Sequence, residues 1–382
     1  MSRWFYYLLV MAVVAPAIDL IWGSQQAPLA IFICSTIALV PLAALIGRAT
    51  ENLEPYVGPI AGGLLNATFG NAPELIIGIF AVRAGLLRVV QASMIGSVIS
   101  NSLLVLGSSL ALGGWRWGRQ YFNAHDAGQY SAMMLLAVAG LLIPSTSALV
   151  IQDQGRLQLV SNAIACVLLV VYALYLLAHV FKVRSERRNP KHAGRAAQAR
   201  STSQEEHEEV EAFTGQIDPQ QDASENTPSL WFSLIILLIA TLGTAWNSEL
   251  LVGTITPVTE ALGWSPVFVG LVIIPIVGNA AEHSSALYIA LRDRVDLSMA
   301  IAAGSSIQVA TLVAPMLVLI SMFFPHHLNL VFPPLELVAL GAAVLLFSVI
   351  SLDGESSWLA GVQLIAIYLM ASIVFFFIPG PG

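Results

Sequence analysis

The sequence predicts an all-α integral membrane protein of eleven transmembrane helices, built as one extra N-terminal helix followed by two inverted five-helix repeats. Three observations predict this fold class: a shortage of charge, a series of long apolar stretches, and a motif that occurs twice. Hydrophobic residues make up 57% of the 382 residues and charged residues only 10%, whereas soluble domains carry about 25% charged residues. The chain has too little charge to cover a water-soluble surface, so lipid is the expected solvent.

Eleven apolar stretches are long enough to cross a bilayer, which takes about 17–25 helical residues. The first stretch has the charge pattern of a signal peptide but no small-residue cleavage site, so we interpret it as a helix. Cys34 and Cys166 lie inside apolar stretches and are interpreted as small core hydrophobes. The predicted spans are residues 4–21, 28–46, 58–82, 89–112, 127–144, 157–181, 229–253, 265–291, 296–324, 333–351 and 357–378.

One long polar linker separates the sixth and seventh spans, and it sets the predicted orientation. Cytoplasmic loops are enriched in Lys and Arg. Placing the linker in the cytoplasm also places the N-terminus there and the C-terminus outside or in a lumen. The acidic stretch Glu205–Glu211 is interpreted as a solvated helix rather than a regulatory calcium site. Of the 16 basic residues, 13 then lie on the cytoplasmic side: Arg3, Arg48, Arg116, Arg119, Lys182, Arg184, Arg187, Arg188, Lys191, Arg195, Arg200, Arg292 and Arg294.

The internal repeat rests on a constant displacement of 208 residues. It maps Gly70-Asn71-Ala72-Pro73-Glu74 onto Gly278-Asn279-Ala280-Ala281-Glu282, and Gly96–Ser100 onto Gly304–Gln308. Five spans is an odd number, so the second repeat crosses the membrane in the opposite sense, as in secondary transporters with a site near the midplane. The predicted regions are 1–27 (extra helix), 28–183 (first repeat), 184–228 (charged linker) and 229–382 (second repeat).

Glu74 and Glu282 are the leading candidates for a functional site because both lie in the middle of a span. An ionised carboxylate there costs about 2.5–3.5 kcal/mol; the alternative is a permanently protonated or paired group kept for packing. Asn71 and Asn279 each precede a glutamate by three residues, which predicts a shared helix face. Pro73 and Pro275 lack a backbone N–H, so a freed carbonyl or a packing kink is expected near each.

A second polar block adds hydroxyls and amides to these carboxylates. Ser97, Ser100 and Asn101 share one predicted helix face, and Ser305 and Gln308 share the matching face; helix–helix hydrogen bonding is the alternative role. Calcium takes 6–8 oxygen ligands, and no soft thiolates accompany the oxygens. Two carboxylates balance one divalent cation, and protonation neutralises the empty site. A cation and protons would therefore compete for the same oxygens.

Three further side chains have two open interpretations each. His283 follows Glu282, where the first repeat has Leu75, and is either a proton acceptor or a helix contact. Glu249 and Glu260 either line an access path or lie at the membrane interface.

The stretches Gly62–Leu75 and Pro275–His283 closely resemble the two signature regions of the calcium/proton exchangers, a branch of the calcium/cation antiporter superfamily. The resemblance covers both repeats and the acidic linker. It implies a fold like that of sodium/calcium exchangers, with alternating access. It implies that Glu74 and Glu282 bind the cation and exchange protons, with supporting roles for Asn71, Ser100, Asn279, His283 and Gln308. Pro73 stands where many members have threonine, which affects the expected ligand set.

The expectation is thus a Ca2+/H+ antiporter, with Ca2+ and H+ as transported ions, no cofactor and no nucleic-acid partner. Alternatives are a Na+/Ca2+ exchanger, another divalent-cation/proton antiporter, and a cation channel. An enzyme is not expected, because no nucleophile elbow or catalytic metal motif is present. A prokaryotic plasma membrane is favoured over a vacuolar membrane, and a homo-oligomer is left open.

Overall fold

The structure is a computed structural model that describes residues 3–57, 62, 65, 68–188 and 229–378. The predicted linker at 184–228 falls almost entirely outside these residues, as does much of the first part of the predicted span at 58–82. The regular elements, in chain order, are α1 (Arg3–Trp22), α2 (Pro28–Val57), α4 (Ala72–Arg83), α5 (Leu87–Ile99), the π-helix η1 (Ser100–Val105), α6 (Leu106–Trp117), β1 (Gln120–Tyr121), α7 (Ala124–Ser147), α8 (Gln154–Arg188), α10 (Leu230–Leu262), α11 (Pro266–Phe268), the π-helix η2 (Val269–Ile273), α12 (Ile274–Gly278), α13 (Ala280–Ala290), α14 (Val295–Gln308), the π-helix η3 (Val309–Val313), α15 (Ala314–Ser321), α16 (Pro334–Leu352), β2 (Glu355–Ser356) and α17 (Trp358–Phe377).

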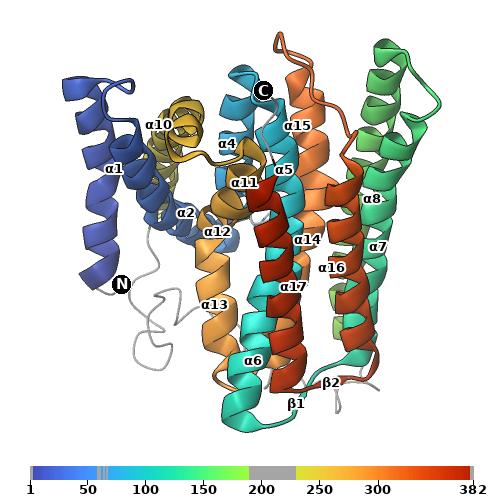
Figure 1. Cartoon of the computed structure of the whole chain (residues 1–382). Coiled ribbons are helices and arrows are strands. Elements are labelled where there is room, and N and C mark those ends of the chain that lie inside the picture. Colours follow the sequence, from blue (N-terminus) through green and yellow to red (C-terminus); the bar gives the residue numbers. More distant parts are fainter. Residues whose placement is uncertain (1–2, 58–61, 63–64, 66–67, 189–228, 379–382) are drawn as a thin grey trace.

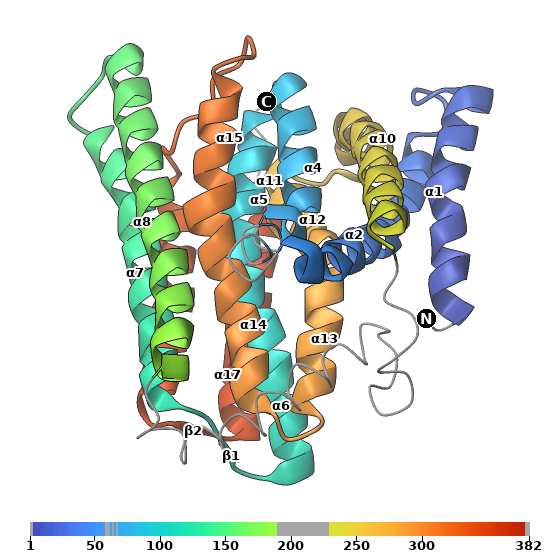
Figure 2. The same ribbon diagram turned by 180° about the vertical axis from the view of Figure 1, so that it is seen from behind.

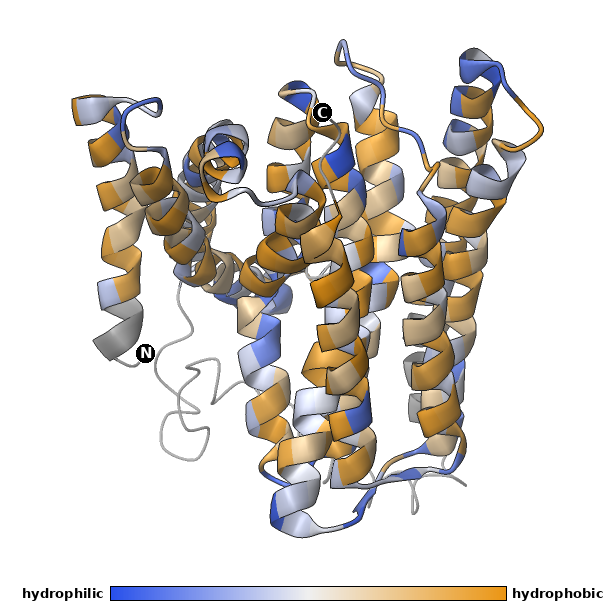
Figure 3. Cartoon of the chain, viewed as in Figure 1, coloured by the Kyte–Doolittle hydropathy of each residue, from blue (hydrophilic) through white to orange (hydrophobic). Residues whose placement is uncertain are grey.

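The chain is an all-helical integral membrane protein. In the described residues, 8 helices are long and apolar enough to cross a membrane, or 9 when a bent pair counts as one span. Trp231, Leu238 and Leu242 on α10 each expose more than half of their surface. Figure 3 shows that such apolar residues cover most of the helical surface while hydrophilic residues gather at the two ends. An apolar surface of this extent suits lipid and would promote aggregation in water.

The helices form a bundle with α5, α14 and α15 near its centre (Figures 1 and 2). The pair α7 and α8 lies on one side, and α1, α2 and α10 lie on the other. One end, which we call the ribbon end, carries the antiparallel strands β1 and β2, with Gln120 opposite Ser356. The opposite end, which we call the connector end, carries the 322–333 segment between α15 and α16 and the end of α17.

Two backbones cross without side chains between them where α5 meets η2. A Cβ atom added to Gly96 would lie 2.2 Å from the carbonyl oxygen of Leu271, and one added to Gly270 would lie 2.6 Å from that of Val89. Small residues allow this approach in helix–helix packing within membranes. Gly304 is related to Gly96 by the 208-residue displacement, yet no described atom lies within 4 Å of a Cβ added there. The two halves therefore pack differently at matching positions.

Helical irregularities occur at matching positions in the two halves. The displacement of 208 residues carries η1 (Ser100–Val105) onto residues 308–313, and η3 spans Val309–Val313. π-Helices are rare and frequently mark functional sites. The helix Pro266–Gly278 is bent by 60° relative to Ala280–Ala290, so the expected span at 265–291 is a broken helix.

Candidate cation-binding site

Both signature motifs lie where a helix starts afresh. Asn71 precedes α4 with φ −100° and ψ 16°, and Asn279 precedes α13 with φ −97° and ψ 14°. A break at Asn therefore precedes each glutamate, and each Asn and its Glu are three residues apart across the first turn of the new helix. Glu74 and Glu282 lie in the first turn of the new helix. Helix N-termini carry a partial positive charge that stabilises carboxylates.

The two carboxylates face each other from opposite halves of the chain. Glu74 and Glu282 are close enough to interact electrostatically. Both side chains are half-buried, and Oε2 of each is shielded from solvent without a hydrogen-bond partner. The Ser305 hydroxyl lies near the Glu282 carboxylate. A Cβ added to Gly278 would lie 3.0 Å from Glu74 Oε1, which explains why the motif places glycine there.

Three hydrogen bonds donated by asparagine side chains join the two halves around these carboxylates. Asn71 Nδ2 donates to Gln308 Oε1 at 2.6 Å, and Asn279 Nδ2 donates to Ser97 Oγ at 3.3 Å. A third bond runs from Asn101 Nδ2 to Ser305 Oγ at 2.9 Å. Five of the residues in these bonds are at most 5% exposed: Asn71, Asn279, Ser97, Asn101 and Ser305. The structure therefore assembles the predicted polar residues of both repeats at one place.

A small cavity of about 10 Å³ lies beside Glu74. A cavity of this size holds about one water molecule. No cluster of three or more His, Cys, Asp or Glu side chains that could hold a metal occurs in the described part of the chain. A hard cation here would take its remaining ligands from amide, hydroxyl and carbonyl oxygens. The lining residues are Glu74, Ser93, Met94, Ser97, Ile274, Val309, Val313 and Leu317.

The remaining predicted residues divide into two groups. Ser100 is fully buried beside the Tyr368 hydroxyl, and His283 keeps a shielded Nε2 that has no partner among the described residues. Glu249 lies elsewhere: its carboxylate is 57% exposed and 3.6 Å from Arg83 Nη1. Glu260 is exposed on α10. The structure thus separates Glu249 and Glu260 from the two motif glutamates.

Two tyrosines complete the surroundings, and sequence reasoning missed both. The Tyr172 hydroxyl of α8 lies near Gln308, and the Tyr368 hydroxyl of α17 lies near Ser100; neither hydroxyl has a hydrogen-bond partner among the described residues. Both are nearly fully buried, at 3% and 4% exposure. Neither lies in a repeated block, so the only available signal was an aromatic ring with a polar tip inside an apolar stretch.

The Asn71–Gln308 bond predicts an energetic coupling between the halves. Gln308→Ala removes the acceptor of a buried bond, which costs about 1–3 kcal/mol. In a double-mutant cycle with Asn71→Ala, we expect the double variant to lose less thermal stability in detergent than the two single losses added together. Interaction energies of contacting residues are about 0.5–3 kcal/mol. Strictly additive losses of Asn71→Ala and Gln308→Ala would contradict the coupling. The control is a second cycle that combines Asn71→Ala with Gln129→Ala, because Gln129 is bonded to His125 at the ribbon end; its losses should be additive.

Comparison with known proteins shows the family of this chain. The sequence profile described as "Sodium/calcium exchanger protein" matches residues 27–181 and 232–377. The chain is 41% identical over 363 residues to a protein named Ca(2+)/H(+) antiporter from Synechocystis, covering 94% of this chain and 92% of that one. It is 40% identical over 378 residues to Ca(2+)/H(+) antiporter ChaA from Bacillus subtilis, covering 98% and 99%.

The solved structure of native YfkE superimposes on the chain with a TM-score of 0.78. The two are 35% identical, and the match covers 98% of this chain and 100% of that one. Sequence profile, relatives and fold extend over nearly the whole length. The chain therefore belongs to the sodium/calcium exchanger protein family.

Proposed function

We propose that this chain is a secondary active antiporter that exports Ca2+ from the cytoplasm in exchange for protons. One observation carries the proposal: Glu74 and Glu282, from opposite halves, begin two half-helices and meet among buried amide and hydroxyl oxygens. The two relatives at 40% and 41% identity, both named Ca(2+)/H(+) antiporters, support it.

Charge balance at the carboxylates couples the two ions. One Ca2+ neutralises Glu74 and Glu282 together. After Ca2+ leaves, two negative charges at close range in a medium of low dielectric repel each other. Protons that bind the carboxylate oxygens remove this repulsion. Protons and Ca2+ then occupy the same oxygens in turn. The two carboxylates and their cargo therefore have no net charge when the site changes the side of the membrane to which it opens.

We propose eleven spans as the full architecture: one extra N-terminal helix and two inverted five-helix repeats. Alternating access follows from the two inverted repeats. Three observations support the repeats: the breaks at Asn71 and Asn279, the matching π-helices η1 and η3, and a family profile that matches one stretch in each half. Inverted repeats let one half-site open to each side of the membrane in turn.

The ribbon end is proposed to face the cytoplasm, together with the 184–228 linker and the N-terminus. Arg116 and Arg119 flank β1, and Arg292 and Arg294 lie in the nearby turn between α13 and α14. The connector end of the described chain holds Arg83, Arg88 and Arg156. With the linker's basic residues added, the excess of positive charge is cytoplasmic. We place the protein in a prokaryotic plasma membrane, with the C-terminus outside.

Ion flux in proteoliposomes tests the function and separates its rivals. We expect a pH gradient to drive Ca2+ accumulation, and an equal Na+ gradient at clamped pH to drive none. Accumulation driven by Na+ alone would overturn the proposal in favour of Na+/Ca2+ exchange. Ca2+ currents at equal pH on both sides, without any counter-ion, would instead indicate a channel. The same vesicles loaded with Mn2+ rank the divalent cations.

A further inference from the structure

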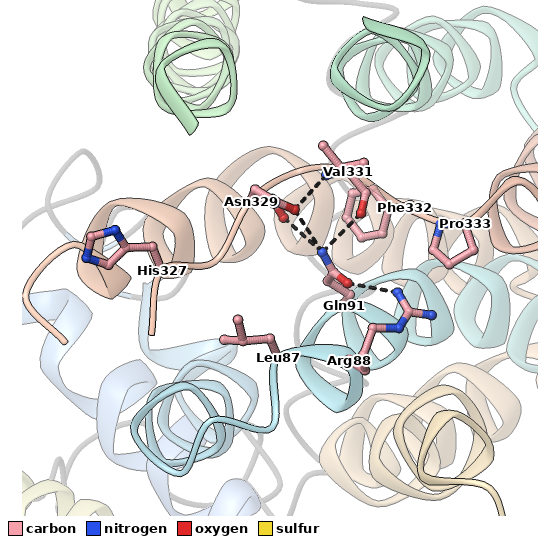
Figure 4. Close-up of a pocket in the computed structure, with 8 residues that line it drawn as sticks. All are labelled: Leu87, Arg88, Gln91, His327, Asn329, Val331, Phe332 and Pro333. Atoms are coloured by element: carbon pink, nitrogen blue, oxygen red, sulfur yellow. Dashed lines mark hydrogen bonds between the residues drawn. The ribbon is translucent and has the colours of Figure 1, made fainter. Parts of the chain in front are cut away.

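A cavity of about 560 Å³, which we call the vestibule, lies at the connector end. Figure 4 shows it between the start of α5 and the segment that joins α15 to α16. It is far larger than the space beside Glu74 and has room for many water molecules. Its lining residues are Leu87, Arg88, Gln91, His327, Asn329, Val331, Phe332 and Pro333.

A hydrogen-bonded network holds one wall of the vestibule in place (Figure 4). Gln91 Nε2 lies 3.1 Å from Asn329 Oδ1 and 3.1 Å from the Val331 carbonyl oxygen. Arg88 Nη1 donates to Gln91 Oε1 at 2.8 Å, and Arg88 Nη2 donates to Glu336 Oε1 at 2.7 Å. Glu336 is only 2% exposed. These hydrogen bonds hold Gln91, Asn329 and Arg88 in one arrangement, while Glu336 Oε2 has no partner among the described residues.

The vestibule and the small cavity beside Glu74 are stacked along the same elements. On α5, Leu87, Gln91, Met94 and Ser97 recur every three or four residues, so they lie on one helix face. The upper two line the vestibule and the lower two line the small cavity. Across from α5, the span Val295–Ser321 lines the small cavity. The 322–333 segment that follows this span lines the vestibule.

Along α5, the apolar Met94 lies between Gln91, which lines the vestibule, and Ser97, which lines the small cavity. Met94, Val313 and Leu317, which we call the outer seam, line the small cavity. Leu317 also packs directly on α4, since a Cβ added to Gly78 would lie 2.6 Å from Leu317 Cδ1. An apolar seam of this kind offers no ligands to replace the 6–8 oxygens around Ca2+.

The charged and titratable groups around the vestibule also disfavour a divalent cation. Arg88 comes from α5, His327 lines the cavity from the connector, and His326 lies against Gly85 at the turn before α5. The buried Glu336 of α16 is paired with Arg88. Water, in contrast, can meet Gln91 and Asn329 above the seam and Ser97 below it. A proton needs only a transient file of water molecules across the seam.

We propose that the outer seam carries protons, but not Ca2+, between the vestibule and Glu74. A hydronium ion in the vestibule passes its proton along the water file to a Glu74 carboxylate oxygen, leaving water behind; release is the reverse. This proton route rests on the proposed antiport. Proton leak and cysteine labelling test the route, whereas pH-driven Ca2+ uptake tests antiport.

Leu317→Ala is expected to raise passive proton permeability in Ca2+-free proteoliposomes by about tenfold, which corresponds to about 1.4 kcal/mol of barrier. The leak of radioactive Ca2+ should stay at the level of the unsubstituted protein. Leu110→Ala truncates an equally buried leucine on α6, away from the seam, and should leave proton permeability unchanged. A folded Leu317→Ala protein with no added proton leak, or with an equal rise in Ca2+ leak, would overturn the proposal.

Cysteine labelling tests the same barrier without relying on transport. In a Cys34→Ala/Cys166→Ala background, His327→Cys should react with a membrane-impermeant thiol reagent added outside, because His327 lines the vestibule and is exposed. Ser97→Cys, at a position that is 2% exposed and lines the small cavity, should be protected with Leu317 present and reactive after Leu317→Ala. If the introduced cysteine in the small cavity stays protected in the Leu317→Ala protein, the proposed proton route is wrong. Antiport itself is judged separately, from pH-driven Ca2+ uptake by the unsubstituted chain.

Discussion

Glu74→Gln and Glu282→Gln are each expected to abolish Ca2+-dependent proton movement in proteoliposomes. Glutamine keeps the shape of glutamate and an amide oxygen, but it loses the negative charge and the site for the transported proton. A unit charge pair about 4 Å apart is worth about 4 kcal/mol at an effective dielectric constant of about 20. Loss of one carboxylate therefore weakens Ca2+ binding by about 10³-fold or more.

Glu249→Gln is the matched control because it changes another membrane-helix glutamate that lies outside the site, exposed beside Arg83. It should retain exchange. In the unsubstituted protein the apparent KM for Ca2+ should rise as pH falls, since protons compete for the same carboxylates. Proton movement coupled to Ca2+ in either motif variant would refute the assignment, whatever Glu249→Gln does.

Gly96→Ala is expected to prevent stable folding, although it adds a single methyl group. The added Cβ would lie 2.2 Å from the Leu271 carbonyl oxygen and 2.6 Å from Leu271 Cα. Backbone atoms cannot swing aside as a side-chain tip can, so the crossing of α5 and η2 must separate. Overpacking in a well-packed core typically costs about 1–3 kcal/mol, and sometimes more. The measurement is the monodisperse fraction and the thermal transition temperature in detergent.

Gly304→Ala supplies a control at the position related by the repeat. No described atom lies within 4 Å of a Cβ there, and alanine favours helix over glycine by about 1 kcal/mol. We expect this variant to fold at least as well as the parent. Equal stability of the two variants would contradict the close crossing at Gly96.

Much of the fold and the heart of the site were predictable from spacing alone. The displacement of 208 residues paired Glu74 with Glu282 and Asn71 with Asn279, and the structure brings all four together. Apolar stretch lengths located the described helices, but α2, α8 and α10 extend beyond the predicted ends at residues 46, 181 and 253, to Val57, Arg188 and Leu262. The π-helices at matching positions fit the same repeat, although no sequence pattern predicted them.

Other features required atoms that are distant in sequence. The proline positions suggested loosened backbone, but the helices start afresh at Asn71 and Asn279. The Leu271 carbonyl, expected to be freed by Pro275, packs against Gly96. Glu249 lies near the end of a predicted span, and its sequence position left an access path or the membrane interface open; in the structure it pairs with Arg83 at the surface. Tyr172 and Tyr368 reached the site from helices without a repeated motif.

The sequence by itself determined the membrane class, the two halves and the pair of carboxylates that would serve a cation and protons. Hydropathy and repeat spacing are local or periodic properties, and they can be read from the order of residues. Only the tertiary structure decided which oxygens surround the carboxylates, that Gly96 is packed while Gly304 is open, and that an apolar seam separates Glu74 from the vestibule. These depend on contacts between segments about 200 residues apart, whose geometry is set by packing.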